Sequence, residues 1–146
     1  MSFTVDKIIK REPLVISENA KVKDAVELMS RENVGLLVIV NSAGKPIGVI
    51  SERDVIRALA SGKDLNARVT EVGTIGNLVT VGPKDSIYKA ALLMNDHKIR
   101  HLVVMDGDKL RGVISIRDII SEERVISRLA ELAEAKPSEA EVSGAD

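Results

Sequence analysis

The sequence predicts an α/β (α+β) fold in which two copies of a β-α-β-β-α unit pack sheet to sheet with pseudo-two-fold symmetry. Three observations support this prediction. The chain repeats itself internally, each copy mixes short apolar strands with amphipathic helices, and 45% of the 146 residues are hydrophobic, which is enough for a real core. Because one such unit leaves a face of its small sheet uncovered, the two copies are expected to cover each other.

The internal repeat is clearest at a seven-residue motif. Gly-Val-Ile-Ser-Glu-Arg-Asp at 48–54 recurs as Gly-Val-Ile-Ser-Ile-Arg-Asp at 112–118, with a single difference. Apolar positions before the motif also correspond, since Ala25 answers to Ala90 at an offset of 65 residues. Agreement over this span indicates a duplicated unit.

The elements follow the same order in both copies. A short apolar strand is followed by a helix with one apolar stripe, then by two strands joined by a tight turn, and finally by a second helix. In the first copy the predicted ranges are 13–16, 22–31, 36–40, 46–50 and 52–60. In the second copy they are 78–81, 87–95, 102–105, 110–114 and 116 onward.

These elements divide the chain into a first repeat at 1–62 and a second repeat at 63–125. The last helix is expected to run on without a break as far as Leu132. Residues 126–146 are then a C-terminal helix extension followed by an acidic tail. From Pro137 onward the tail has few bulky apolar residues, so we expect it to be flexible.

The composition argues against several classes of function. Phe3 and Tyr88 are the only aromatic residues and the formal net charge is -1, so the stacking surfaces and basic excess of nucleic-acid-binding proteins are missing. The longest apolar run, 34–40, is far shorter than the roughly 20 residues that cross a bilayer. The N-terminal residues lack the features of a secretory signal. We expect a cytoplasmic protein that binds neither nucleic acid nor membrane.

No set of residues points to catalysis. There are no cysteines. His97 and His101 are four residues apart, but the helix is expected to end near His97, which places His101 in a strand, and no carboxylate is placed to complete a metal site. We therefore expect no enzyme activity, no catalytic cofactor and no metal.

The residues that carry chemistry are expected where a strand passes into a helix, in the repeated motif. The Ser would cap the helix and leave first-turn N–H groups open to a phosphate, and the Arg would add charge. The Asp would accept from a ribose diol, and the Gly would let a ligand approach the backbone. These residues are Gly48, Ser51, Arg53 and Asp54 in the first copy and Gly112, Ser115, Arg117 and Asp118 in the second.

The same Ser-x-x-Asp spacing also fits a capping box, which stabilises a helix by about 1 kcal/mol and binds nothing. Capping needs neither the Gly nor the Arg, yet both recur at the same place in each copy. Ligand binding is therefore favoured. A structural dimerisation scaffold, in which the motifs only cap helices, stays open as the alternative.

The duplication, the β-α-β-β-α order and the Gly-x-x-Ser-x-x-Asp ending resemble the CBS domain, which usually occurs as a pair called a Bateman module. The resemblance covers about residues 5–125. It implies a regulatory module with a cleft between the repeats for an adenine nucleotide, AMP being favoured over ADP and ATP. Some members take S-adenosylmethionine or NAD instead. It also implies a homodimer that signals to an effector protein, which the sequence does not identify.

The resemblance assigns further roles. The motif Asp would hold the ribose and the motif Ser would lie near the phosphate. Arg100 and His101 would reach a phosphate and make one cleft the stronger site, and the alternative is that they only form a solvated strand end. Where the family often has a proline in the central strand, this chain has Val38 and Val103, which leaves the ligand open. The residues expected to frame the base, by backbone or aliphatic side chain, are Val15, Ile16, Ile50, Val79, Thr80 and Ile114.

Overall fold

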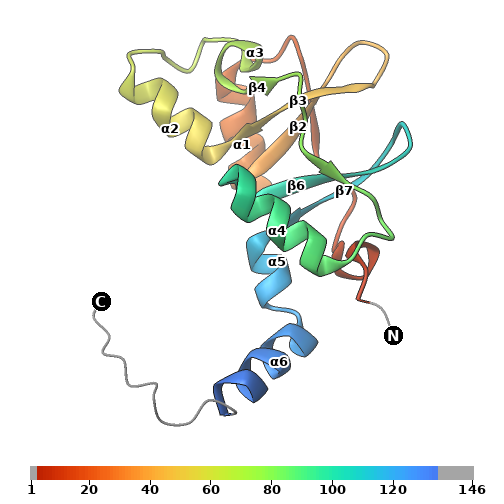
Figure 1. Cartoon of the computed structure of the whole chain (residues 1–146). Coiled ribbons are helices and arrows are strands. Elements are labelled where there is room, and N and C mark those ends of the chain that lie inside the picture. Colours follow the sequence, from red (N-terminus) through yellow and green to blue (C-terminus); the bar gives the residue numbers. More distant parts are fainter. Residues whose placement is uncertain (1–2, 135–146) are drawn as a thin grey trace.

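The computed structural model describes residues 3–134 and shows a mixed α+β architecture with two sheets (Figure 1). The tail predicted from Pro137 lies outside the described residues. The first repeat contains β1 (Val15–Ser17), α1 (Val22–Glu32), β2 (Leu36–Val40), β3 (Pro46–Ser51) and α2 (Glu52–Ala60). The second contains β5 (Thr80–Val81), α4 (Ile87–His97), β6 (His101–Asp106), β7 (Lys109–Ser115) and α5 (Ile116–Ile120). The predicted order of elements is confirmed in both repeats.

The two sheets share their topology. In each, the first strand runs parallel to the central strand, and the central strand pairs antiparallel with the next. The register also shifts at the same place, between Ile39 and Val40 in the first sheet and between Val104 and Met105 in the second. The pseudo-symmetry read from the sequence therefore extends to backbone irregularities.

Each repeat has its own aliphatic core. Alternate residues of the central strands face the helices, and Leu37 and Leu102 are almost completely buried there. Val38 and Val103 point to the other face of their sheets. They are also buried, at 0% and 3% exposure, yet belong to neither core. On this face Leu36 and Val49 of the first sheet and Val103 of the second line one hollow, so the two sheets face each other there as predicted.

Two segments that were not predicted as elements are exchanged between the repeats. The leading segment, residues 3–10, contains the 3-10 helix η1 (Val5–Ile8) and packs on the core of the second repeat. Its Val5 N–H donates to the Asp85 carbonyl at 2.9 Å. The inter-repeat segment, residues 65–77, contains α3 (Val69–Val72) and β4 (Thr74–Ile75) and completes the first repeat. There β4 extends the first sheet as a fourth strand beside β3.

The prediction of an unbroken last helix is wrong. α5 ends at Ile120, and α6 (Glu123–Glu134) starts after a two-residue break and runs away from the body of the molecule (Figure 1). The break is capped on both sides. The Ser121 N–H donates to the Arg117 carbonyl at 2.9 Å, and the Glu122 carboxylate accepts from the Arg124 N–H at 3.4 Å. The change of direction lets Arg124 lie over the Phe3 ring of the leading segment, 4.1 Å from its centroid.

Candidate functional site

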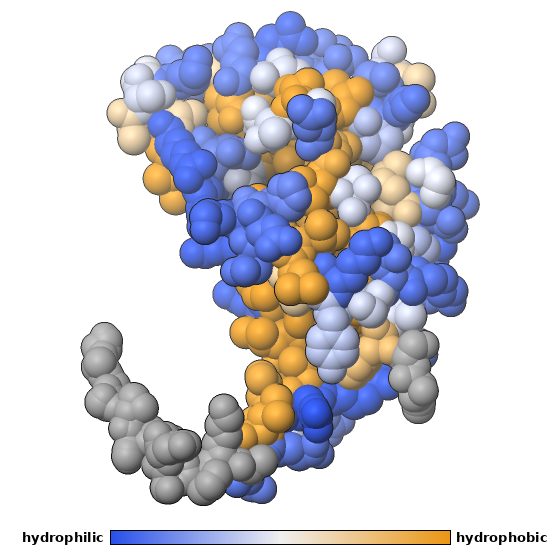
Figure 2. Space-filling view, viewed as in Figure 1, coloured by the Kyte–Doolittle hydropathy of each residue, from blue (hydrophilic) through white to orange (hydrophobic). Residues whose placement is uncertain are grey.

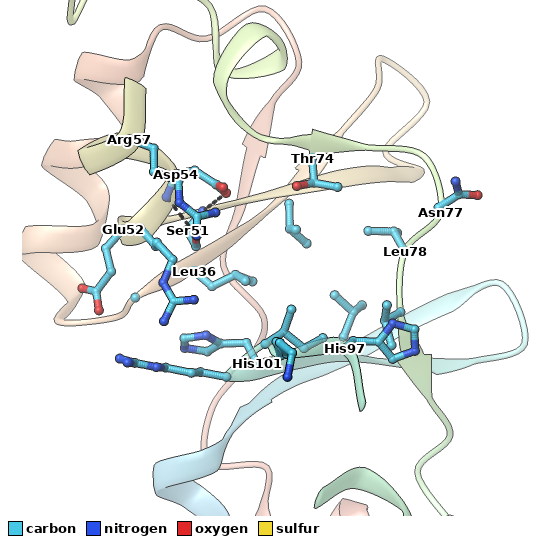
Figure 3. Close-up of a pocket in the computed structure, with 18 of the residues that line it drawn as sticks. Leu36, Ser51, Glu52, Asp54, Arg57, Thr74, Asn77, Leu78, His97 and His101 are labelled. Atoms are coloured by element: carbon cyan, nitrogen blue, oxygen red, sulfur yellow. Dashed lines mark hydrogen bonds between the residues drawn. The ribbon is translucent and has the colours of Figure 1, made fainter. Parts of the chain in front are cut away.

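Two hollows lie between the repeats, with volumes of about 570 and 560 Å³. The first joins the start of α2 to residues 77–79, which precede β5 of the other repeat. The second joins the start of α5 to residues 10–14, which precede β1. Each hollow therefore needs both repeats, and each has the size of a small-ligand pocket. Figure 3 shows the first hollow, with Ser51 and Asp54 on one side and Asn77 and Leu78 on the other.

The motif Ser and Asp of each repeat form a capping box. In the first, the Asp54 N–H donates to Ser51 Oγ at 3.1 Å and the Ser51 N–H donates to Asp54 Oδ2 at 2.9 Å. The second repeat has the same pair between Ser115 and Asp118, at 3.1 and 2.8 Å. Capping uses only the Oδ2 atom of each carboxylate, so Oδ1 and the serine O–H take no part in the capping box. The structural role is therefore real and is compatible with ligand binding.

The expectation that the first-turn N–H groups are open to an anion needs correction. The Glu52 N–H donates to the Gly35 carbonyl at 3.0 Å, and the Ile116 N–H donates to the Arg100 carbonyl at 2.8 Å. Together with the capping bonds, two of the first three N–H groups of α2 and α5 are already satisfied. Charge for an anion must therefore come chiefly from side chains.

The arginine of each motif lines a hollow, as expected for a residue that adds positive charge for a phosphate. Arg53 lines the first hollow and Arg117 lines the second. Arg100 and His101 line both hollows, and which hollow binds more tightly stays a prediction. The hollows differ at the motif carboxylates. Lys10 Nζ lies 3.5 Å from Asp118 Oδ1, whereas Asp54 makes no ion pair among the described residues.

The surroundings of His101 perturb its titration. Burial lowers its pKa below the ordinary value of 6.5, and the carboxylates of Glu52 and Asp118 oppose that shift, while Arg100 adds to it. The neutral imidazole is therefore favoured in the folded protein.

This shift predicts that stability falls as the pH is lowered below 6.5. Because the folded pKa lies below the unfolded one, the unfolded chain binds more protons between the two values, and the free energy of unfolding decreases with falling pH. Urea denaturation between pH 5 and 8 is expected to show a smaller decrease in His101→Asn than in the wild type. His97→Asn, which changes an exposed histidine, serves as the control. Identical pH profiles for wild type and His101→Asn would contradict the assignment.

The predicted base-framing residues are only partly brought to the hollows. Val79 lines the first and Ile114 lines the second. Ile16 and Ile50 are instead buried in the first core. Val15 and Thr80 line neither hollow. Strand alternation explains the burial of Ile16 and Ile50, which face the helices of their own repeat. Ile114 also belongs to a core, that of the second repeat, and still borders the second hollow.

The motif glycines also line neither hollow. A Cβ at Gly48 would overlap the Thr74 carbonyl oxygen and lie 2.6 Å from Ile75 Cδ1. A Cβ at Gly112 would lie 2.9 Å from Ile9 Cγ2. The space beside each glycine is therefore taken by one of the exchanged segments, where the sequence analysis had expected a ligand.

Several polar residues of the hollows were not predicted. Most precede the first strand of a repeat or follow its first helix, and the pseudo-two-fold pairing brings these stretches beside the motif of the other repeat. Only Glu52, inside the motif, had a local signal. The residues are Glu52 in both hollows, Arg57, Thr74, Asn77, His97 and Lys98 in the first, and Lys10, Arg11, Glu12 and Asn33 in the second. Within residues 3–134, no group of three or more His, Asp or Glu side chains is arranged to hold a metal ion, and no helix is long and apolar enough to span a membrane.

Two pseudo-symmetric sheets with a hollow on either side of their junction define a tandem-repeat module of the ligand-sensing type. The CBS domain matches residues 5–61 and 69–124, so the chain belongs to the CBS domain family. The resemblance read from the motifs is confirmed.

Solved structures agree with this assignment. A CBS domain protein from Pyrobaculum aerophilum, complexed with AMP, is 31% identical, has a TM-score of 0.80, and is matched over 88% of this chain and 99% of its own. The CBS domain pair of protein MJ0100, in complex with 5'-methylthioadenosine and S-adenosyl-L-methionine, is 25% identical with a TM-score of 0.75, over 93% of this chain and 100% of its own. An uncharacterized 33.4 kDa protein of Thermofilum pendens is 30% identical over 86% of this chain, which spans 42% of that relative's length.

Proposed function

We propose that the two hollows bind an adenine nucleotide, with AMP favoured over ADP and ATP, and that the module is regulatory and not catalytic. The observation that carries the proposal is that each hollow joins a Ser, an Arg and an Asp from one repeat to aliphatic residues from the other. The AMP complex of the Pyrobaculum aerophilum protein supports this choice of ligand. Binding would then be communicated to a separate effector protein.

The chemistry of the first hollow suits a nucleoside monophosphate. Asp54 Oδ1 is left by the capping box to accept from a ribose diol, and the Ser51 O–H and the Arg53 guanidinium provide donors and charge for a phosphate. Aliphatic side chains such as Leu36 and Val79 can hold a purine without an aromatic partner.

The scaffold alternative keeps one specific observation in its favour, because both motifs do cap helices. Removing a motif Asp therefore costs stability under either proposal. A matched control is provided by Asp24, which accepts from the Lys21 N–H at 2.9 Å at the start of α1 and lines neither hollow.

The test is isothermal titration calorimetry with AMP, ADP, ATP, S-adenosylmethionine and NAD on the wild type, Asp54→Ala and Asp24→Ala. Both variants are expected to lose about 1 kcal/mol of stability from the cap. Only Asp54→Ala is expected to lose nucleotide affinity in the first hollow, by tenfold or more. No heat with any ligand from folded wild type, or equal affinity in the two variants, would favour the scaffold.

We also infer that the module forms a homodimer. Figure 2 shows hydrophobic side chains in a band over α4 and α5 that continues towards α6. Large apolar side chains remain exposed there, and stable association would remove them from water. Light scattering after size exclusion tests this: Leu92→Asp, which charges a side chain that is 62% exposed, is expected to shift the wild-type dimer to a monomer. The exposed apolar residues of these helices are Tyr88, Leu92, Ile116, Ile120, Ile126, Leu129 and Leu132.

A further inference from the structure

The two hollows have five lining residues in common, which we call the shared wall. Its basic members come from the second repeat only. The shared wall consists of Gly35, Leu36, Glu52, Arg100 and His101. At the offset of 65 residues, Gly35-Leu36 of the first repeat corresponds to Arg100-His101 of the second. One pair of basic residues therefore stands where full symmetry would have supplied two.

The absence of a side chain at Gly35 is what gives this pair its central position. A Cβ there would lie 3.4 Å from His101 Cε1 and 3.2 Å from Glu52 Oε1. The glycine leaves room for the imidazole, so His101 borders both hollows instead of being pushed into one.

The Arg100 side chain is available to a phosphate in either hollow. The backbone of this residue is fixed, because its carbonyl accepts from the Ile116 N–H, but its side chain makes no ion pair among residues 3–134. In contrast, Arg53 and Arg117 each line a single hollow. If phosphates were bound in both hollows at once, Arg53 would serve only the first and Arg117 only the second. Both phosphates would compete for Arg100.

We infer that Arg100 and His101 form one phosphate-binding group shared by both hollows, so that nucleotide in one hollow weakens binding in the other. This inference rests on the proposed function. The physical cause is twofold. The first phosphate takes up the positive charge of Arg100, and a second phosphate on the other side of the shared wall is repelled by the first. Coupling of this kind is reciprocal, so each hollow affects the other by the same factor.

The test is AMP titration by calorimetry on the wild type and five variants, which are Asp54→Ala, Asp54→Ala with Arg117→Ala, Arg100→Ala, Arg100→Ala with Asp54→Ala, and Arg53→Ala. The wild type is expected to bind a second AMP about tenfold more weakly than the same hollow binds it alone. That reference affinity comes from Asp54→Ala, in which the first hollow is disabled. The remaining site should vanish when Arg117→Ala is added, which assigns it to the second hollow.

Arg100→Ala supplies the decisive comparison. It is expected to weaken AMP binding in both hollows about tenfold. It is also expected to reduce the coupling, so that adding Asp54→Ala to Arg100→Ala improves binding in the second hollow by less than Asp54→Ala does on its own. Arg53→Ala is expected to weaken the first hollow alone. Independent sites in the wild type, or an Arg100→Ala effect on one hollow only, would overturn the inference and leave the proposed function standing. No AMP binding at all would overturn both.

Discussion

Replacing Ile8 by alanine is expected to lower the free energy of unfolding by about 2–5 kcal/mol. Ile8 is 4% exposed and lies in the core of the second repeat, although it precedes the first repeat in the chain. The loss combines the transfer energy of the deleted methyl groups with the cavity left among residues that include Val81 and Ile87. Urea denaturation measures it.

The matched control is Lys7→Ala, on the same short helix but exposed, which is expected to change stability by less than about 0.5 kcal/mol. Hydrogen exchange adds a second readout. Ile8→Ala should speed exchange of amides in α4 before those in α1, because η1 packs on the second core. A loss of protection confined to the first repeat would contradict the exchange of segments.

Replacing Gly48 by alanine is expected to destabilise the protein by about 1–3 kcal/mol. The added Cβ would overlap the backbone of β4 at Thr74, which cannot yield without breaking its pairing with β3. Because β4 leads directly into residues 77–79 of the first hollow, we also expect AMP affinity in that hollow to fall. Thermal melting and calorimetry follow the two effects.

Gly112→Ala is the pseudo-symmetric control. There the new Cβ meets the side chain of Ile9 at 2.9 Å, and a side chain can rotate away where a backbone cannot. We expect a smaller loss of stability than in Gly48→Ala. If Gly112→Ala lost as much stability as Gly48→Ala, or more, then overlap with the β4 backbone would not be the reason why position 48 requires glycine.

The regular part of the fold was predictable because the repeat confirmed each element twice. β2 has the predicted bounds 36–40, and α2 has the predicted bounds 52–60. The short elements η1, α3 and β4 were not predicted, since elements of two to four residues show no hydrophobic period. The break before α6 was not predicted either, because no Gly or Pro marks it in residues 116–134.

Only the part of the site that lies within the sequence motif itself was predictable. Ser51, Arg53 and Asp54 all line the first hollow, because a strand-to-helix junction positions its own side chains. Residues supplied from the other repeat, such as Asn77 and Lys10, depend on how the repeats pair and left no local signal. The motif glycines were misread for the same reason, since their neighbours lie in distant segments.

The exchanged segments carry a consequence for the origin of the molecule. Residues 3–10 lead into the first repeat but pack on the second, and residues 65–77 lead into the second repeat but complete the first. A half-length ancestor built this way would have lent its leading segment to a sister chain, as in a domain-swapped dimer. Joining the two chains end to end would then preserve every contact of that dimer. In that history, dimerisation came before the gene duplication that joined the repeats, and neither repeat had to fold as an isolated monomer.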